Sequence, residues 1–149
     1  MDISTMISAF SMAIAALTLL FSVITSYKSA LRVKKQATLD AYNLLQEQGL
    51  DRLNDYHPEN VKEIIKNEES NEYKEVSKIL ARIEHFSAGI NEGIYDLNTL
   101  YELAHGYFDE AVYNTVIKLI NQKEEDEEVF NNYKRVVKKM RIKHRKQGY

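Results

Sequence analysis

The chain opens with a long apolar stretch and is richly charged after it. Residues Ile3 to Tyr27 hold no charged side chain, and every charged residue except Asp2 lies from Lys28 onward. A helix needs roughly 20 predominantly apolar residues to cross the hydrocarbon core of a bilayer. The stretch meets that length and contains no proline or glycine. The pattern predicts a transmembrane helix over residues 1–27 and a second region over residues 28–149.

Two other interpretations of the apolar stretch fit the sequence less well. A secretory signal peptide begins with basic residues and has a short apolar run. Here the chain begins Met-Asp, the run is long, and the basic residues follow it. A buried core helix is also disfavoured, because an uncharged run of this length exceeds what a small soluble core normally hides.

The residues after the apolar stretch show helical periodicity. Residues 28–56 are expected to continue helically, as one helix or as two if Gly49 interrupts them, with their apolar face made of Ala37, Ala41, Leu44, Leu45 and Leu53. The pair His57-Pro58 breaks this run. Residues 60–67 then form a short helix whose apolar positions are Val61, Ile64 and Ile65.

Two stronger helices follow. Ser70 is expected to cap a helix that reaches about Asn91 and ends at Gly93, with an apolar face of Val76, Ile79, Leu80, Ile83, Phe86 and Ile90. Asp96 is expected to cap a short helix through Ala104 that Gly106 closes.

A last helix is predicted from about residue 109 towards residue 146. Its inner side would be formed by Val112, Val116, Ile117, Leu119, Ile120, Phe130, Tyr133, Val136, Val137 and Met140. No alternating run of strand length occurs in the sequence. The predicted fold is therefore all-α: one N-terminal transmembrane helix followed by a cytosolic helical bundle, without a second domain or a repeat.

The charges beside the apolar stretch predict its orientation. The bases that follow it directly are Lys28, Arg32, Lys34 and Lys35, and no base precedes it. Positive residues stay on the cytoplasmic side of a membrane. We therefore expect a single-pass protein of the inner (cytoplasmic) membrane, with its N-terminus outside, its C-terminal domain in the cytosol, and these bases among the lipid headgroups.

The apolar stretch also carries a periodic row of small and hydroxyl residues. Their spacing alternates between four and three positions, and a repeat of about 3.5 residues keeps one seam of a helix facing a neighbour. We call this row the hydroxyl stripe: Ser4, Ser8, Ser11, Ala15, Thr18, Ser22 and Thr25. Small residues and interhelical hydrogen bonds drive helix association in lipid. The stripe predicts a homo-oligomer.

The stripe allows two structures for that oligomer. It can be a dry packing seam that only holds the helices together. It can also line a pore, since polar groups within a membrane commonly face a bundle interior or a water-filled cavity. A hydroxyl can, in addition, bond the backbone of its own preceding turn. In the pore, the bases Lys28 to Lys35 would surround the inner mouth and disfavour cations.

The sequence offers little for catalysis. It has no cysteine, no phosphate-binding glycine loop and no zinc-binding helix motif, so thiolate chemistry and cysteine–zinc sites are excluded. Glu102 and His105 have the spacing of a di-iron helix, but no second copy of that motif occurs. We expect no enzyme, no catalytic or metal-binding residue and no cofactor.

Charge is strongly segregated towards the C-terminus. Residues 124–128 form an acidic block, and a basic tail begins at about residue 134, with Lys134, Arg135, Lys138, Lys139, Arg141, Lys143, Arg145 and Lys146. The tail can be a solvated helix end or can bind anionic lipid headgroups. Nucleic acid is a less favoured partner that the tail does not exclude, since no aromatic residue lies between Tyr133 and Tyr149 for stacking on bases.

The most distinctive segment of the second region runs from residue 82 to residue 96. Arg82, His85 and Gly89 share one face of the predicted helix. Glycine inside a helix costs about 1 kcal/mol relative to alanine. Close packing explains such a glycine best, and a ligand held against the backbone is the alternative.

This segment, preceded by one transmembrane helix, resembles a family of small bacterial membrane proteins known as a domain of unknown function. The shared motif is an aromatic residue, a helix-interior glycine and then Gly93-Ile-Tyr-Asp96 at a helix junction. The resemblance implies an N-terminal anchor with a helical cytosolic domain, and no catalytic residues. Proteins of this kind also resemble the membrane effectors of bacterial antiphage systems.

These features together favour a homo-oligomeric membrane effector, with an ion-conducting bundle gated by its cytosolic helices. The alternative is a membrane-tethered adaptor that docks a soluble signalling partner or ligand. The expected partners are other copies of the chain, membrane lipids and, for the adaptor, the soluble signalling partner or ligand.

Overall fold

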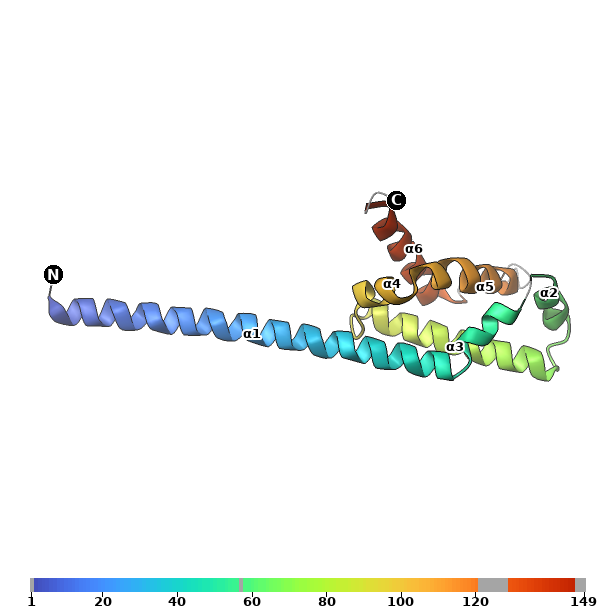
Figure 1. Cartoon of the computed structure of the whole chain (residues 1–149), viewed down its shortest axis with the longest axis horizontal. Helices are drawn as coiled ribbons and strands as arrows, with labels where there is room; N and C mark the ends of the chain where they lie inside the picture. The colour runs from blue at the N-terminus through green and yellow to red at the C-terminus, as the bar shows by residue number, and fades with distance from the viewer. Residues whose placement is uncertain (1, 57, 121–128, 147–149) are drawn as a thin grey trace. The chain divides into compact units, whose positions relative to one another are not determined.

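The computed structural model describes residues 2–56, 58–120 and 129–146. By its internal contacts the chain forms two units, Met1–Lys34 and Lys35–Tyr149. We call the second the helical unit. Every regular element among the described residues is a helix, as predicted (Figure 1). The boundary between the two units, after Lys34, comes from contacts within the chain, so it does not test the predicted end of the membrane span at Tyr27.

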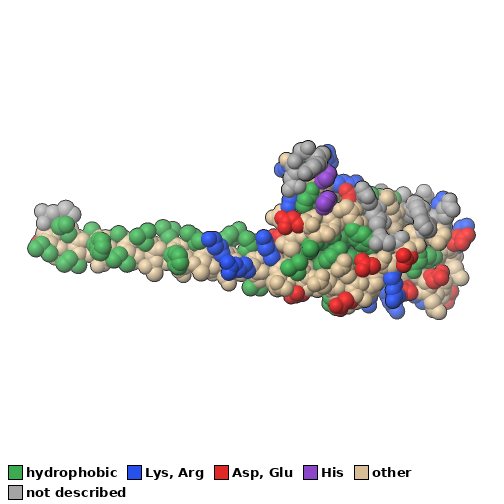
Figure 2. Space-filling view, viewed as in Figure 1, with side chains coloured by type: hydrophobic (Ala, Val, Ile, Leu, Met, Phe, Trp, Pro, Cys, Tyr) green, Lys and Arg blue, Asp and Glu red, His purple; other side chains and the backbone are tan. Residues whose placement is uncertain are grey.

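The first helix, α1, spans Ile3–Glu47. On the face drawn in Figure 2, the N-terminal part of α1 bears mostly hydrophobic side chains until the first lysine and arginine residues. All large hydrophobic side chains between Ile3 and Tyr27 are at least half exposed. Monomeric soluble proteins rarely expose contiguous apolar surface of this extent. One helix of the described chain is thus long and apolar enough to cross a membrane.

The sequence left open whether residues 28–56 form one helix or two, and the structure places the break at Gly49. α1 ends at Glu47, and Gly49 has φ +104°, a left-handed conformation that suits glycine. A 3₁₀ segment, η1, follows over Leu50–Asp55. Of the predicted apolar face, Leu45 and Leu53 are buried, Ala37 and Ala41 are partly buried, and Leu44 is exposed. That exposure is a departure from the expected face.

The two helices that follow were predicted closely. α2 spans Pro58–Lys66 and buries its three predicted apolar positions. α3 spans Asn71–Asn91, and its whole predicted apolar face is buried. The Ser70 hydroxyl accepts a hydrogen bond from the Tyr73 amide at 3.0 Å, which confirms the predicted N-cap. Gly93, at φ +76°, ends the run as predicted.

The short helix α4, Leu97–Gly106, has the predicted cap but an ending of a different kind. The Asp96 carboxylate accepts hydrogen bonds from the amide and the hydroxyl of Thr99, both at 2.8 Å. The helix ends at Gly106 as expected, but without the left-handed conformation of a glycine C-cap. Gly106 is right-handed helical, the irregular residue is Ala104 at φ −148°, and the chain continues into a π-helical segment, η2, over Tyr107–Val112.

The prediction of one last helix from residue 109 to residue 146 is wrong. The structure has α5 over Tyr113–Ile120 and α6 over Asn131–Lys146. Phe130 precedes α6 with φ +62°, a conformation that a regular helix does not contain. The acidic block at 124–128 lies outside the described residues.

The buried side of these last helices was nevertheless predicted. Val112 is buried, and so are four α6 residues: Tyr133, Val136, Val137 and Met140. Ile117 and Phe130 are partly buried. The side chains of Val116, Leu119 and Ile120 are outside the described part of the structure.

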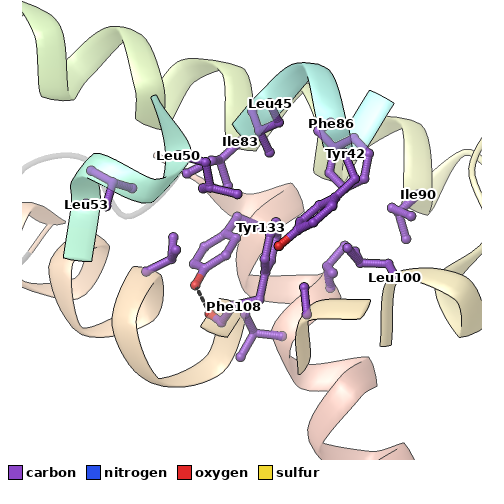
Figure 3. Packing of buried hydrophobic residues seen from close by; sticks show 14 of the residues in the cluster. Tyr42, Leu45, Leu50, Leu53, Ile83, Phe86, Ile90, Leu100, Phe108 and Tyr133 are labelled. Atoms are coloured by element: carbon purple, nitrogen blue, oxygen red, sulfur yellow. Dashed lines mark hydrogen bonds between the residues drawn. The ribbon is translucent and has the colours of Figure 1, made fainter. Parts of the chain in front are cut away.

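The core of the helical unit is formed around two aromatic rings. Tyr133 and Phe108 are fully buried, with ring centroids 5.8 Å apart (Figure 3). The Tyr133 hydroxyl donates a hydrogen bond to the Phe108 carbonyl. Burial of this hydroxyl, with a smaller contribution from the nearby Asp109 carboxylate, raises the pKa of Tyr133 far above its ordinary value. The tyrosine is therefore a neutral hydrogen-bond donor that fixes η2 to α6.

The N-terminus of α6 is capped by a side chain of α3. Glu84 Oε1 accepts hydrogen bonds from the backbone amide and the side-chain amide of Asn132, and Oε2 accepts one from the Tyr133 amide, each at 2.9 Å. A carboxylate at this position satisfies amides that have no partner within the helix and interacts favourably with the helix dipole.

We expect Glu84→Gln to lower the free energy of unfolding of the helical unit by about 1–2 kcal/mol. The substitution keeps the shape but removes the charge that strengthens these three hydrogen bonds. Thermal unfolding of the full chain in mild detergent, followed by circular dichroism, measures the effect. Glu102→Gln, at an exposed position of α4, is the matched control and should leave the midpoint unchanged. Equal midpoints for both variants would contradict the capping role.

Ser87 is a buried polar residue on the same helix. Its hydroxyl has no hydrogen-bond partner among the described residues, although it is one turn from Glu84 and from Asn91, both of which bond α6. We expect Ser87→Ala to leave stability unchanged or to raise it by up to about 1 kcal/mol, because the buried hydroxyl gains nothing. The same unfolding assay measures this. A loss of stability above that size would show that the hydroxyl is bonded in solution.

Candidate functional site

An apolar groove lies between the C-terminal part of α1 and the middle of α3. It has a volume of about 330 Å³ and is lined by Ala41, Leu44, Leu45, Gln48, Ala81, Arg82, His85, Phe86 and Tyr95. Leu44 is 51% exposed and forms part of its wall. Two polar residues of α3, Arg82 and His85, are exposed at its edge. The groove thus joins an apolar wall to two basic side chains.

Arg82 has a structural contact at this edge. Its Nη1 donates a hydrogen bond to the Gln48 carbonyl at 3.0 Å, directly after the end of α1. The last carbonyls of a helix have no partner within it, and basic side chains commonly satisfy them. Arg82 therefore fixes the end of α1 against α3 from an exposed position. His85 forms no hydrogen bond with a described residue and is available to a ligand in the groove.

Gly89 does not line the groove. It is buried, and a Cβ atom at this position would lie 2.5 Å from Cε2 of Tyr95. The Tyr95 ring is held there by stacking on Phe86, with centroids 5.1 Å apart. The Gly89 carbonyl also accepts hydrogen bonds from the amides of Ile94 and Tyr95, at 2.9 and 3.1 Å. The glycine is accounted for by close packing, the favoured sequence interpretation.

The segment from Gly93 to Asp96 joins three helices. Gly93 turns the chain, Tyr95 packs against α3, and Asp96 caps α4. The Asp96 amide also donates a hydrogen bond to the buried Thr38 hydroxyl of α1, at 2.7 Å. This motif therefore fixes the walls of the groove. Sequence reasoning missed Leu44, Gln48 and Tyr95 as lining residues, because their proximity depends on how α1 packs against α3.

The hydroxyl stripe lies wholly on α1, and every one of its side chains is exposed. Thr18 and Thr25 each donate a hydrogen bond to the carbonyl four residues earlier, at 2.9 and 2.8 Å. Ser8, Ser11 and Ser22 make no hydrogen bond to a described residue. The threonines are thus satisfied within the helix, whereas these three serines can bond a neighbouring helix or water.

The bases that follow the apolar stretch also lie on α1. Lys28, Arg32 and Lys35 are exposed, and Lys34 is partly buried. They follow Tyr27 within two helical turns and form the basic group visible in Figure 2. Their place in the chain suits contact with phosphate headgroups next to a spanning helix.

Of the pair with metal-like spacing, Glu102 and His105, only His105 belongs to a cluster of rings. The His105 Nδ1 lies 3.0 Å from the Tyr101 carbonyl, and its ring stacks on Tyr101 with centroids 4.6 Å apart. The His144 ring of α6 lies against both. Among the described residues, no three histidine, aspartate or glutamate side chains are grouped so that they could hold a metal ion.

Comparison with known proteins identifies a family. No curated protein and no solved structure matches the chain. A family described as a domain of unknown function, DUF4760, matches residues 5–140, which include α1, the groove and most of α6. The chain therefore belongs to the DUF4760 family.

Proposed function

We propose that the chain is a single-pass protein of the bacterial inner membrane that self-associates through α1 and acts as a membrane effector. Its N-terminus is outside and its helical unit is in the cytosol, as the bases after Tyr27 favour. The observation that carries the proposal is the hydroxyl stripe, exposed along a helix whose other sides are apolar. Three of its serines, Ser8, Ser11 and Ser22, make no hydrogen bond to a described residue, and small polar residues are what associating membrane helices use.

The three unpaired serines favour a conducting assembly over a dry seam. Ser8, Ser11 and Ser22 lie on the same stripe of the apolar stretch, and hydroxyl groups that face a common axis can solvate an ion. The exposed bases that follow would surround the inner mouth and disfavour cations there. The resemblance to antiphage membrane effectors favours antiphage defence as the process in which the chain acts.

Reconstitution in liposomes tests the conducting assembly. We expect the full chain to release a trapped anion indicator from the liposomes. The variant Ser8→Leu/Ser11→Leu/Ser22→Leu should show a flux at least about tenfold lower, because leucine removes the polar lining. Ile7→Leu/Ile14→Leu/Ile24→Leu is the matched control, since it changes three residues of the same span outside the stripe. Equal flux from both variants would contradict a pore along the stripe.

The groove favours a second candidate, a membrane-tethered adaptor. It joins an apolar wall to Arg82 and His85, and such a surface suits an amphipathic helix of a soluble partner with an acidic side chain. In this case the spanning helix is only an anchor. Replacement of residues 1–27 by an unrelated transmembrane helix should then restore function in cells, whereas the pore proposal predicts loss of function with the helical unit intact.

A further inference from the structure

The bases of α6 divide into those that are used within the fold and those that are not. Lys139 donates to Asn91 at 2.8 Å, and Arg141 pairs with Asp109 at 2.6 Å. Lys143 donates to Asn98 at 2.8 Å and lies over the Tyr101 ring. The remaining bases with no hydrogen bond or ion pair to a described residue are Arg135, Lys138, Arg145 and Lys146, and all four are exposed. Within the described part of the chain, no hydrogen bond or ion pair engages this charge.

These four bases lie on one face of the helix. Together with Ile142, their spacing of three, four, three and one residues keeps them on the side opposite the buried row of Tyr133, Val136, Val137 and Met140. We call them the basic face: Arg135, Lys138, Ile142, Arg145 and Lys146. α6 contains no acidic residue to neutralise this face.

An apolar side chain lies among these four bases. Ile142 is 41% exposed, and it is flanked one turn on either side by Lys138 and by Arg145 and Lys146. Bases around an exposed aliphatic residue are the pattern of a helix that lies at a membrane surface, where the bases meet phosphates and the aliphatic side chain enters the acyl boundary. A site for single-stranded nucleic acid would favour an aromatic residue at this place instead, because unpaired bases stack on aromatic rings.

We propose that the basic face of α6 binds the headgroups of anionic phospholipids. This inference rests on the proposed membrane location, because a domain attached to a spanning helix meets the headgroups at high effective concentration. Each base near an anionic surface increases membrane association by a factor of about five. The four bases are therefore enough to hold α6 at an anionic surface and to release it when salt is raised.

The absence of cysteine from the sequence makes a direct test possible. The full chain with the single substitution Ile142→Cys is placed in nanodiscs of phosphatidylcholine alone, or with about one third phosphatidylglycerol, and labelled with a water-soluble maleimide. We expect labelling about tenfold slower in the anionic discs at low salt, because the basic face is covered, and equal rates in both discs at 0.5 M salt. Equal rates in both discs at low salt would overturn the proposal.

Two charge variants locate the effect. Arg135→Gln/Lys138→Gln/Arg145→Gln should remove the difference between the discs, whereas Lys62→Gln/Lys74→Gln/Lys78→Gln, which neutralises exposed bases of α2 and α3, should keep it. If both variants lost the difference in labelling rate between the discs, net charge alone would explain the protection. That result would overturn the assignment to the basic face. Circular dichroism of each variant checks that it remains helical.

Further controls separate this proposal from its alternatives. Duplex DNA added to chains in neutral discs could protect position 142 as strongly as anionic lipid does. In that case nucleic-acid phosphates would be the ligand of the basic face, and the proposal would be overturned. Incorporation of the chain into neutral discs tests only whether the apolar part of α1 inserts into a membrane. Failure to incorporate contradicts the proposed function, whereas incorporation without lipid-dependent protection contradicts only the role of the basic face.

Discussion

Gly89→Ala is expected to destabilise the helical unit by about 1–2 kcal/mol, although alanine is the better helix former. The added Cβ would lie 2.5 Å from Cε2 and 2.6 Å from Cδ2 of Tyr95. The ring cannot move away cheaply, since it is stacked on Phe86 and its backbone amide is bonded to the Gly89 carbonyl. Overpacking of a close contact costs about 1–3 kcal/mol, which exceeds the gain in helix propensity of about 1 kcal/mol. Thermal unfolding in mild detergent measures the loss.

Two controls separate this clash from other effects of alanine. Gly106 is right-handed helical, and a Cβ at this position would meet nothing within 4 Å, so Gly106→Ala should be neutral or stabilising. In a Tyr95→Ala background the clash is absent, and Gly89→Ala should then cost nothing. An equal loss from Gly89→Ala with and without the Tyr95 ring would show that the ring is not the cause.

Ser11→Leu/Thr18→Leu/Ser22→Leu is expected to weaken self-association by roughly 2 kcal/mol or more, a factor of about thirty in the association constant. Leucine on the stripe keeps the helices further apart and removes the Ser11 and Ser22 hydroxyls, which are available to bond across the interface. Energy transfer between labelled chains, titrated against lipid at a constant protein amount, measures the association constant. Wild-type affinity in this variant would contradict assembly along the stripe.

The two kinds of hydroxyl in the stripe provide a finer comparison. Thr18 and Thr25 already bond their own backbone, so Thr18→Val/Thr25→Val should change association little. Ser11→Ala/Ser22→Ala removes hydroxyls that have no partner within the chain and should weaken association more. Equal effects of the two pairs would mean that the seam depends on side-chain size alone.

Local signals predicted most of the helices in the sequence. Ser70 and Asp96 are capping residues whose hydrogen bonds involve amides only three positions away, and Gly93 takes a conformation that glycine favours. Such features depend on near neighbours, so they can be predicted without the tertiary structure. The split between α5 and α6 was missed because Phe130 adopts a left-handed conformation without a residue type that signals it.

The groove could not be predicted from the sequence, because it depends on how α1 packs against α3. Arg82 and His85 were identified from their common helix face, but the wall that faces them comes from α1, more than thirty residues earlier. Leu44 was expected in the core and is exposed in the wall of the groove instead. A contact between distant segments depends on how two helices pack, and apolar periodicity alone does not specify which apolar residue lies at the edge of the contact.

The central claim is that copies of the chain meet along the hydroxyl stripe, and a cysteine scan of α1 tests it most directly. Single cysteines are placed at each position from Ser4 to Ser26 in a chain that has none, and native membranes are then oxidised or treated with a water-soluble thiol reagent. We expect crosslinking at Ser8, Ser11, Ala15 and the later stripe positions. If the bundle has a water-filled lumen, the thiol reagent should label the same positions. Crosslinking and labelling without any period along the helix would contradict the claim.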